Sequence, residues 1–268
     1  MMLARILVFI LLSCSLTLAQ NSQPLPQSSA ENEKAEEIIR KAVEALGGNA
    51  YLQVRTQIGR GFYTTFQEGV SQIPARFVDY VSYPNRERTE FVGSGVRVIQ
   101  TNVGDSGWLF DGATKTISDM KPAQIEDFKR SMRTSLENLL HGWWRNDSAV
   151  LKYVGRREAG LAKRNETVRI SYPDGFWIEY EFGARDNLPS KIIYKRKRAN
   201  ATSDEAEETT EEERLAKPIT IDGITAPWVI DHFSNGVQTS RINYESIEYN
   251  RPLADSLFAK PENVKALK

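Results

Sequence analysis

Residues 219–249 read ITIDGITAPWVIDHFSNGVQTSRINYESIEY, and this stretch decides the fold. It contains three short β-type runs, at 219–221, 225–234 and 238–249. Three residues separate each run from the next, and the separators begin with the dipeptides Asp222-Gly223 and Asn235-Gly236. Both dipeptides tolerate the positive φ angles of tight hairpin turns, so we expect each to join adjacent antiparallel strands.

The same pattern extends over most of the chain from residue 53 onward. Asp111-Gly112 and Asp174-Gly175 mark two more hairpins. The remaining candidate strands are 57–67, 73–83, 86–92, 96–103, 107–110, 114–119, 151–158, 166–172, 176–182 and 191–197. Regular hairpins produce a meander, so we expect a mainly β protein with helices, built as a curved antiparallel sheet or barrel.

Two helices are predicted to cap this sheet. The first has apolar residues at helical spacing from Ala35 to Leu46 and is ended by Gly47-Gly48. An amphipathic helix buries its apolar face against another element, and we expect that element to be the sheet. The second helix follows Pro122, and its apolar positions are Ile125, Phe128, Met132, Leu136, Leu139, Leu140, Trp143 and Trp144. It is expected to close one face of a barrel or, alternatively, to line a soft apolar site.

An acidic run follows a basic strand near the middle of the second half. Residues 204–213 hold seven carboxylates, and residues 191–198 hold five cations. We expect residues 199–216 to form a mobile acidic loop whose charge offsets that of the strand before it. The alternative is a basic patch that this loop gates.

The first residues look like a targeting segment. One cation within residues 1–5, the apolar run 6–12 and small residues at Thr17 and Ala19 predict a signal peptide, 1–19, cleaved after Ala19. In an alternative interpretation, Leu11-Leu12-Ser13-Cys14 is a lipobox and Cys14 carries a lipid anchor. Residues 20–30 are predicted to be a flexible tether, and 31–268 a single domain.

The composition argues against most classes of enzyme. The chain of 268 residues has 35 Lys and Arg against 35 Asp and Glu, which gives no basis for a nucleic-acid binder. One Cys and two His leave little room for a metal site. Ser118-x-x-Lys121 and Asp231-His232 are the nearest matches to catalytic patterns, and both lack the partners that such chemistry needs. We therefore predict no catalytic residue, no metal and no cofactor.

The remaining chemistry is apolar and aromatic. Trp108 and Phe110 alternate on one face of a strand, and Phe62 and Phe66 share a face of another. A curved sheet under two helices either fills its interior or leaves a cavity, and apolar cavities suit lipids and acyl chains. The predicted ligand-binding residues are Phe62, Phe66, Trp108, Phe110, Phe128, Met132, Leu136, Trp143 and Trp144.

Taken together, three stretches resemble the LolA/LolB-like periplasmic lipoprotein-carrier superfamily, especially its outer-membrane lipoprotein-sorting protein-like members. The stretches are 41–48 with 59–62, 83–88 with 104–112, and 222–250 with 255–261. The resemblance implies a half-open curved antiparallel β-barrel capped by two helices, with a concave apolar face that receives lipid. It also implies that Trp108 and Phe110 line that face. Tyr83 stands where characterised carriers have a basic residue that latches the helical lid.

These observations predict an exported periplasmic binding protein, a monomer, that holds lipid or lipoprotein acyl chains and transfers them to the outer membrane. Transient contacts with a membrane or with envelope proteins are expected, and nucleic acid is not. The alternative is an envelope protein-interaction or stress-sensor domain without lipid cargo.

Overall fold

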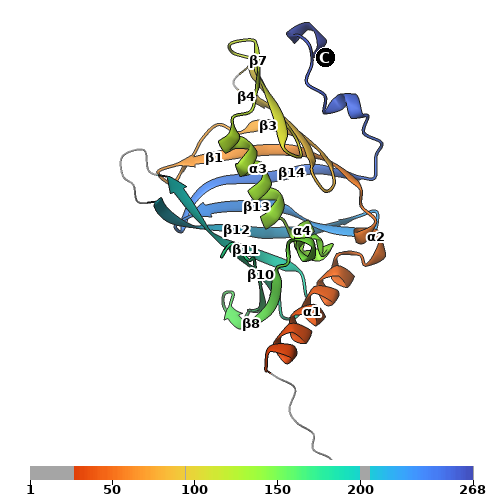
Figure 1. Cartoon of the computed structure of the whole chain (residues 1–268), viewed down its shortest axis with the longest axis vertical. Coiled ribbons are helices and arrows are strands. Elements are labelled where there is room, and N and C mark those ends of the chain that lie inside the picture. The colour runs from red at the N-terminus through yellow and green to blue at the C-terminus, as the bar shows by residue number, and fades with distance from the viewer. Residues whose placement is uncertain (1–26, 94, 200–205, 268) are drawn as a thin grey trace, which may run out of the picture.

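The computed structural model describes residues 27–93, 95–199 and 206–267 (Figure 1). Within these ranges the helices are α1 (Gln27–Leu46), α2 (Asn49–Leu52), α3 (Pro122–Thr134), α4 (Leu136–Leu140) and the short 3-10 helices η1 (Trp143–Asp147), η2 (Asp255–Leu257) and η3 (Val264–Ala266). The strands are β1 (Thr56–Gln67), β2 (Val70–Ser71), β3 (Ala75–Ser82), β4 (Arg86–Gly93), β5 (Val96–Val103), β6 (Ser106–Asp111), β7 (Thr116–Asp119), β8 (Val150–Glu158), β9 (Arg164–Ser171), β10 (Trp177–Gly183), β11 (Pro189–Ala199), β12 (Ala206–Ile221), β13 (Ile224–Ser234) and β14 (Val237–Tyr249).

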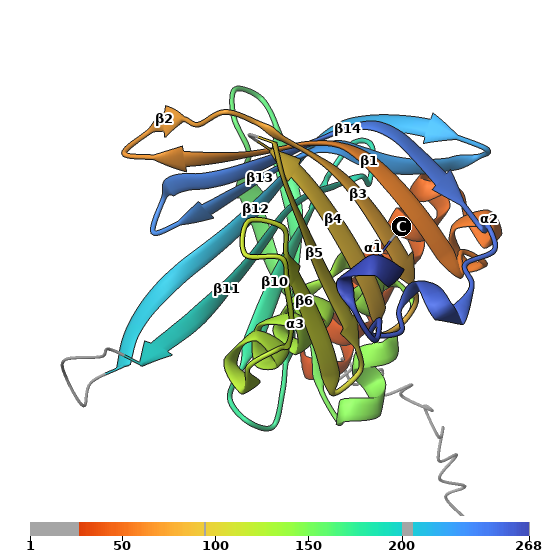
Figure 2. The same ribbon diagram turned by 90° about the horizontal axis from the view of Figure 1, so that it is seen from above.

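All these strands belong to one antiparallel sheet that bends over the helices (Figure 2). The strand order is β7-β6-β5-β4-β3-β1-β14-β13-β12-β11-β10-β9-β8, with β2 paired to β1. Because β1 pairs with β14, the two halves of the meander form one surface, whereas the edge strands β7 and β8 stay apart. The predicted half-open, curved antiparallel sheet is therefore confirmed, and it is not a closed barrel. The connection from β7 to β8 contains α3 and α4, so these helices lie where the barrel is open.

The four predicted hairpins are all present. Asp222-Gly223 and Asn235-Gly236 have positive φ at both positions, as tight primed turns require. The other two turns use the aspartate side chain instead: Asp111 Oδ1 accepts from the N–H of Ala113 at 2.8 Å, and Asp174 Oδ1 accepts from the N–H of Phe176 at 2.9 Å.

Helix α1 packs its apolar stripe on the sheet, as predicted. Ala35, Ile39 and Leu46 are buried in one core with Leu151 of β8 and Ile170 of β9. Burial of each large aliphatic side chain contributes about 1.5–3 kcal/mol, so this helix is anchored by the hydrophobic effect. The helix begins at Gln27, so residues 27–30 of the predicted tether are helical.

The second predicted helix is broken into α3, α4 and η1. Ser135 has an extended backbone, with φ −60° and ψ 151°. Its hydroxyl accepts a hydrogen bond from the Asn138 N–H at 3.1 Å and so caps α4. The apolar spacing continues across Ser135, so periodicity alone predicts one continuous helix and does not reveal the break.

The predicted acidic loop is wrong for residues 206–216. These residues form the first part of β12, which pairs with β11 from Ala206 to Arg214. The register places acidic residues opposite basic ones, for example Glu208 opposite Lys197. Opposite charges across an antiparallel pair stabilise the strands, so the charge run that indicated a loop is half of a hairpin.

Among the described residues, no helix combines the length and apolar character needed to span a bilayer. The predicted signal peptide, Cys14 and the tether up to residue 26 lie outside the described residues.

Candidate functional site

Aromatic rings cover the inner face of the sheet, which is the face that α1 and α4 cover. The centroid of the Phe77 ring lies 5.6 Å from that of Tyr244 and 6.5 Å from that of Phe91, which in turn lies 5.6 Å from that of Tyr63. Phe77 is buried and the other three rings are half-buried. A Cβ at Gly59 would lie 2.6 Å from a ring carbon of Tyr244, so glycine makes room for this ring.

Carboxylates share the inner face with these rings. Burial raises the pKa of Asp79 on β3 and of Glu87 on β4, and the charge of Asp79 raises that of Glu87 further. Burial also raises the pKa of Glu213 on β12 to about 7, with a smaller contribution from Glu137 of α4. These acids are therefore partly uncharged near neutral pH, which makes the inner face less polar than its sequence suggests.

The pKa of Glu213 predicts how stability depends on pH. A carboxyl whose folded-state pKa lies above its unfolded value binds its proton more tightly in the folded state, so stability falls as pH rises from about 4.5 through about 7. Glu213→Gln, which mimics the protonated acid, is expected to raise the melting temperature by roughly 5 °C at pH 8.5 and to leave it unchanged at pH 4.

Thermal unfolding at both pH values checks this expectation, with Glu245→Gln as the exposed control. Equal shifts at the two pH values for Glu213→Gln contradict it.

Helices α3 and α4, residues 122–140, form a lid over the inner face (Figures 1 and 2). Ion pairs tie α3 to both halves of the sheet. Lys129 Nζ lies 2.7 Å from Asp105 in the β5–β6 turn, and Asp127 Oδ1 lies 2.6 Å from Arg196 Nη2 of β11. Exposed pairs of this kind contribute at most about 1 kcal/mol each, so α3 is held more weakly than α1.

The space beneath α4 is nearly filled. A cavity of about 30 Å³ remains there, lined among others by Tyr51, Tyr83, Leu136, His141 and Tyr249. It has room for one or two water molecules. An acyl chain therefore enters the space beneath α4 only when the lid moves.

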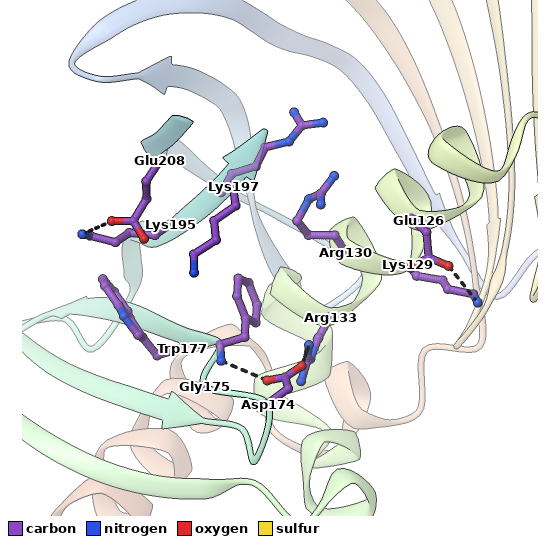
Figure 3. Close-up of a pocket in the computed structure, with 12 residues that line it drawn as sticks. Glu126, Lys129, Arg130, Arg133, Asp174, Gly175, Trp177, Lys195, Lys197 and Glu208 are labelled. Carbon is purple, nitrogen blue, oxygen red and sulfur yellow. Dashed lines mark hydrogen bonds and ion pairs between the residues drawn. The ribbon is translucent and has the colours of Figure 1, made fainter. Parts of the chain in front are cut away.

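A larger cleft opens beside α3 (Figure 3). Its volume is about 630 Å³, and it is walled by α3, the β9–β10 turn and the end of β11. Its lining is strongly basic, with six cations against three carboxylates. The lining residues are Glu126, Lys129, Arg130, Arg133, Asp174, Gly175, Phe176, Trp177, Lys195, Arg196, Lys197 and Glu208.

The structure divides the predicted ligand-binding residues between the two faces of the sheet. Trp108 and Phe110 are buried on the outer face beneath the C-terminal segment 250–267, and the Trp108 Nε1 donates to the Phe258 carbonyl at 3.0 Å. The register places Phe62 and Phe66 on the outer face as well, and Arg76 lies over the Phe62 ring. These four residues do not meet those of the lid.

The other five predicted residues lie in the segment from α3 to η1, on the helical side of the sheet. Phe128 of α3 is buried and Met132 is half-buried. Leu136 and Trp144 belong to the core that includes α1. The ring of Trp143 stacks on His141 with centroids 4.7 Å apart. Their predicted role in ligand binding stays a prediction.

The inner-face rings were missed from sequence. Phe77 and Phe91 lie in strands that were predicted, and Gly59-x-Gly61 beside them was a usable signal, because paired glycines in a strand indicate a close approach by a bulky neighbour. The inner and outer faces carry similar rings, so alternation alone does not tell which face the helices cover.

The residues considered for catalysis lie apart. Ser118 is exposed on β7, whereas His232 lies on β13, where its Nδ1 is 3.0 Å from the Ser240 hydroxyl. Burial lowers the pKa values of His232 and His141, which favours the neutral imidazole in both. In the part of the chain that the structure describes, no three His, Cys, Asp or Glu side chains are grouped as metal ligands.

The sequence matches no protein-family profile and no curated protein, but its structure resembles several solved ones. A DUF1329 family protein from Desulfovibrio piger superposes with a TM-score of 0.57 at 11% identity, covering 84% of this chain and 97% of the other. A putative outer membrane lipoprotein-sorting protein domain from Vibrio parahaemolyticus gives 0.54 at 10% identity, covering 85% and 97%.

A LolA superfamily protein from Nitrosomonas europaea superposes with a TM-score of 0.53 at 14% identity, covering 84% of this chain and 97% of the other. Identities this low establish the fold alone. The match extends over nearly the whole length of each solved chain, so the open sheet and its helices are shared as one unit.

Proposed function

We propose that this chain, which has a LolA-like fold, binds the acyl chains of a lipid or lipoprotein on the inner face of its sheet, beneath the lid. In this proposal the protein is exported by its signal peptide to the periplasm and carries its cargo toward the outer membrane. The observation that carries the proposal is a ring-lined inner face under a helix that only two buried apolar side chains and a few ion pairs hold in place.

The energies of lid opening and chain burial are compatible. Opening α3 exposes Ile125 and Phe128, which costs about 3–6 kcal/mol, and breaks the exposed ion pairs. Burial of one acyl chain of a dozen methylenes contributes about 10 kcal/mol, at about 0.8 kcal/mol per methylene. The ligand therefore supplies enough free energy to shift the lid from closed to open.

Uptake of a fluorescent fatty-acyl probe tests the proposal. We expect saturable binding and a loss of affinity of roughly tenfold in Phe91→Ser, because the change removes a ring from the inner face. Phe62→Ser, on the outer face, is the matched control and should bind the probe as the unchanged protein does.

Two results would count against the proposal: no probe uptake by folded protein, or equal losses in both variants. The alternative inferred from sequence, an envelope protein-interaction domain, predicts no uptake together with one stable protein partner in a pull-down from envelope extract.

A further inference from the structure

The cleft beside α3 exists because two neighbouring strands end at different places. Strand β10 begins at Trp177, and its pairing with β11 begins at Ile178 opposite Tyr194. Strand β11 continues to Ala199 and, beyond Tyr194, has only β12 as a strand neighbour among the described residues. The cleft lies where β10 is missing beside this part of β11, and helix α3 and the β9–β10 turn form its other walls.

Three arginines supply much of the positive charge of this cleft. The side chains of Arg130, Arg133 and Arg196 are 25–29% exposed, so they are partly withdrawn from water. One carboxylate, Asp127, pairs with both Arg130 and Arg196. Guanidinium groups present paired N–H donors that match phosphate oxygens.

Arg133 is held in position before any ligand arrives. Its guanidinium carbon lies 3.7 Å from the Tyr172 ring centroid and 5.0 Å from that of Phe176. Its Nη1 donates to Asp174 Oδ2 at 2.7 Å. A cation fixed in this way loses little conformational entropy on binding an anion.

Lys197 completes the basic lining. Figure 3 shows its side chain extending into the cleft, between Trp177 and Arg130. Within the described residues it forms no ion pair, in contrast to Lys195, which bonds Glu208. An ammonium group aimed into a cavity attracts an anion without a fixed geometry.

The cleft connects to the inner face through aromatic rings. The Phe176 ring lies at its edge, with its centroid 6.1 Å from that of Tyr172 and 6.2 Å from that of Tyr194. Tyr194 lies opposite Ile178, which belongs to the core of the inner face. A line of ring contacts therefore connects the basic cleft to the apolar core that α1 and α4 cover.

We propose that this cleft binds the phosphate-bearing head of an anionic amphiphile whose chain lies on the inner face. The inference rests on the proposed function and names its ligand class. A volume of about 630 Å³ suits a small-molecule head group, and the line of ring contacts gives the chain its direction. An acidic peptide added to the open edge of β11 would use the cations but not this line of ring contacts.

A matched pair of probes tests the proposal. Lysophosphatidic acid and monoacylglycerol with the same acyl chain differ only in the phosphate. We expect the unchanged protein to bind lysophosphatidic acid at least about tenfold more tightly in low salt. The double variant Arg133→Gln/Lys197→Gln should bind both probes with the affinity that the unchanged protein has for monoacylglycerol.

The control variant is Arg40→Gln on α1, an exposed cation outside the cleft, which should keep the preference for the phosphate. Equal affinity of the unchanged protein for both probes overturns this proposal and leaves the proposed function standing. Binding of neither probe overturns both.

Two competitors separate the possible sources of the anion. If glycerol 3-phosphate binds the cleft and neither amphiphile does, the site takes a free phosphate compound and the amphiphile proposal is wrong. If an acidic peptide displaces lysophosphatidic acid and binds more tightly than it, the cleft is a peptide site and the proposal is again wrong.

Discussion

Tying α3 to the β5–β6 turn with a short covalent linker is expected to abolish uptake of an acyl probe. Asp105 and Lys129 form the ion pair that joins the lid to the N-terminal half of the sheet, with the nitrogen and oxygen 2.7 Å apart. Both side chains are at least 44% exposed, so cysteines at these positions will react readily. The chain has a single native cysteine, Cys14, so the protein expressed from residue 20 contains no competing thiol.

The size of this effect follows from the space available. With the lid closed, the cavity beneath α4 measures about 30 Å³, which is room for one or two water molecules and far less than an acyl chain needs. The Asp105→Cys/Lys129→Cys variant is joined with a cleavable bismaleimide and incubated with the probe. Uptake should fall at least about a hundredfold and return when the linker is cleaved.

The control for this experiment is the same variant treated with a monofunctional maleimide, which modifies both cysteines without joining them. Full uptake by the cross-linked protein would mean that the probe binds without lid movement. The space beneath the lid would then not be the binding surface, and the proposed function would fail in that form.

The sequence was most informative where backbone chemistry is local. Asn235-Gly236 and Asp222-Gly223 predicted hairpins that the structure contains, because the left-handed backbone of such turns depends on those two residues alone. The stripe of α1 was equally readable, because its spacing and its ending at Gly47-Gly48 are properties of the helix itself.

Contacts between residues that are far apart in the sequence could not be predicted from local patterns. Trp108 and Phe110 have the pattern of a ligand-lining strand, yet Val264 and Leu267 of the C-terminal segment cover them. Nothing in the strand's own sequence tells which partner its rings meet, since 150 residues separate Trp108 from Phe258. The basic cleft was hidden for the same reason, because it requires α3, the β9–β10 turn and β11 to meet.

The charge run at 206–216 shows how composition misleads when pairing is ignored. Glu213 and Glu211 lie opposite Ile192 and Tyr194, so one side of this acidic strand faces the interior. Burial of an ionised carboxylate costs free energy, and this cost falls when the group takes up a proton. Burial accordingly raises the pKa of Glu213 to about 7. The composition of an isolated segment does not contain this information.

Removal of the Arg157 charge is expected to cause a large loss of stability for a change at a residue that is partly exposed. Arg157 of β8 lies between two carboxylates of β10: its Nη2 is 2.6 Å from Glu179 Oε2, and its Nη1 is 3.3 Å from Glu181 Oε1. Both carboxylate side chains are at most 3% exposed, whereas the arginine is 38% exposed. Among the described residues, Arg157→Met would leave Arg169 as the side-chain partner of Glu179 and Asn165 as that of Glu181.

An uncompensated buried charge typically costs 3–5 kcal/mol, and the partial exposure of Arg157 places our expectation at about 3 kcal/mol. Chemical denaturation of Arg157→Met measures this loss. Arg40→Met is the matched control, because its pair with Glu44 is 61% exposed on both sides, and it should lose no more than about 0.5 kcal/mol. A second change, Glu181→Gln, should restore part of the stability of Arg157→Met, because it removes one of the two uncompensated buried charges.

If Arg157→Met and Arg40→Met lose the same amount of stability, the buried ion-pair network does not hold β8, β9 and β10 together. The apolar core under α1 must then stabilise that half of the sheet alone.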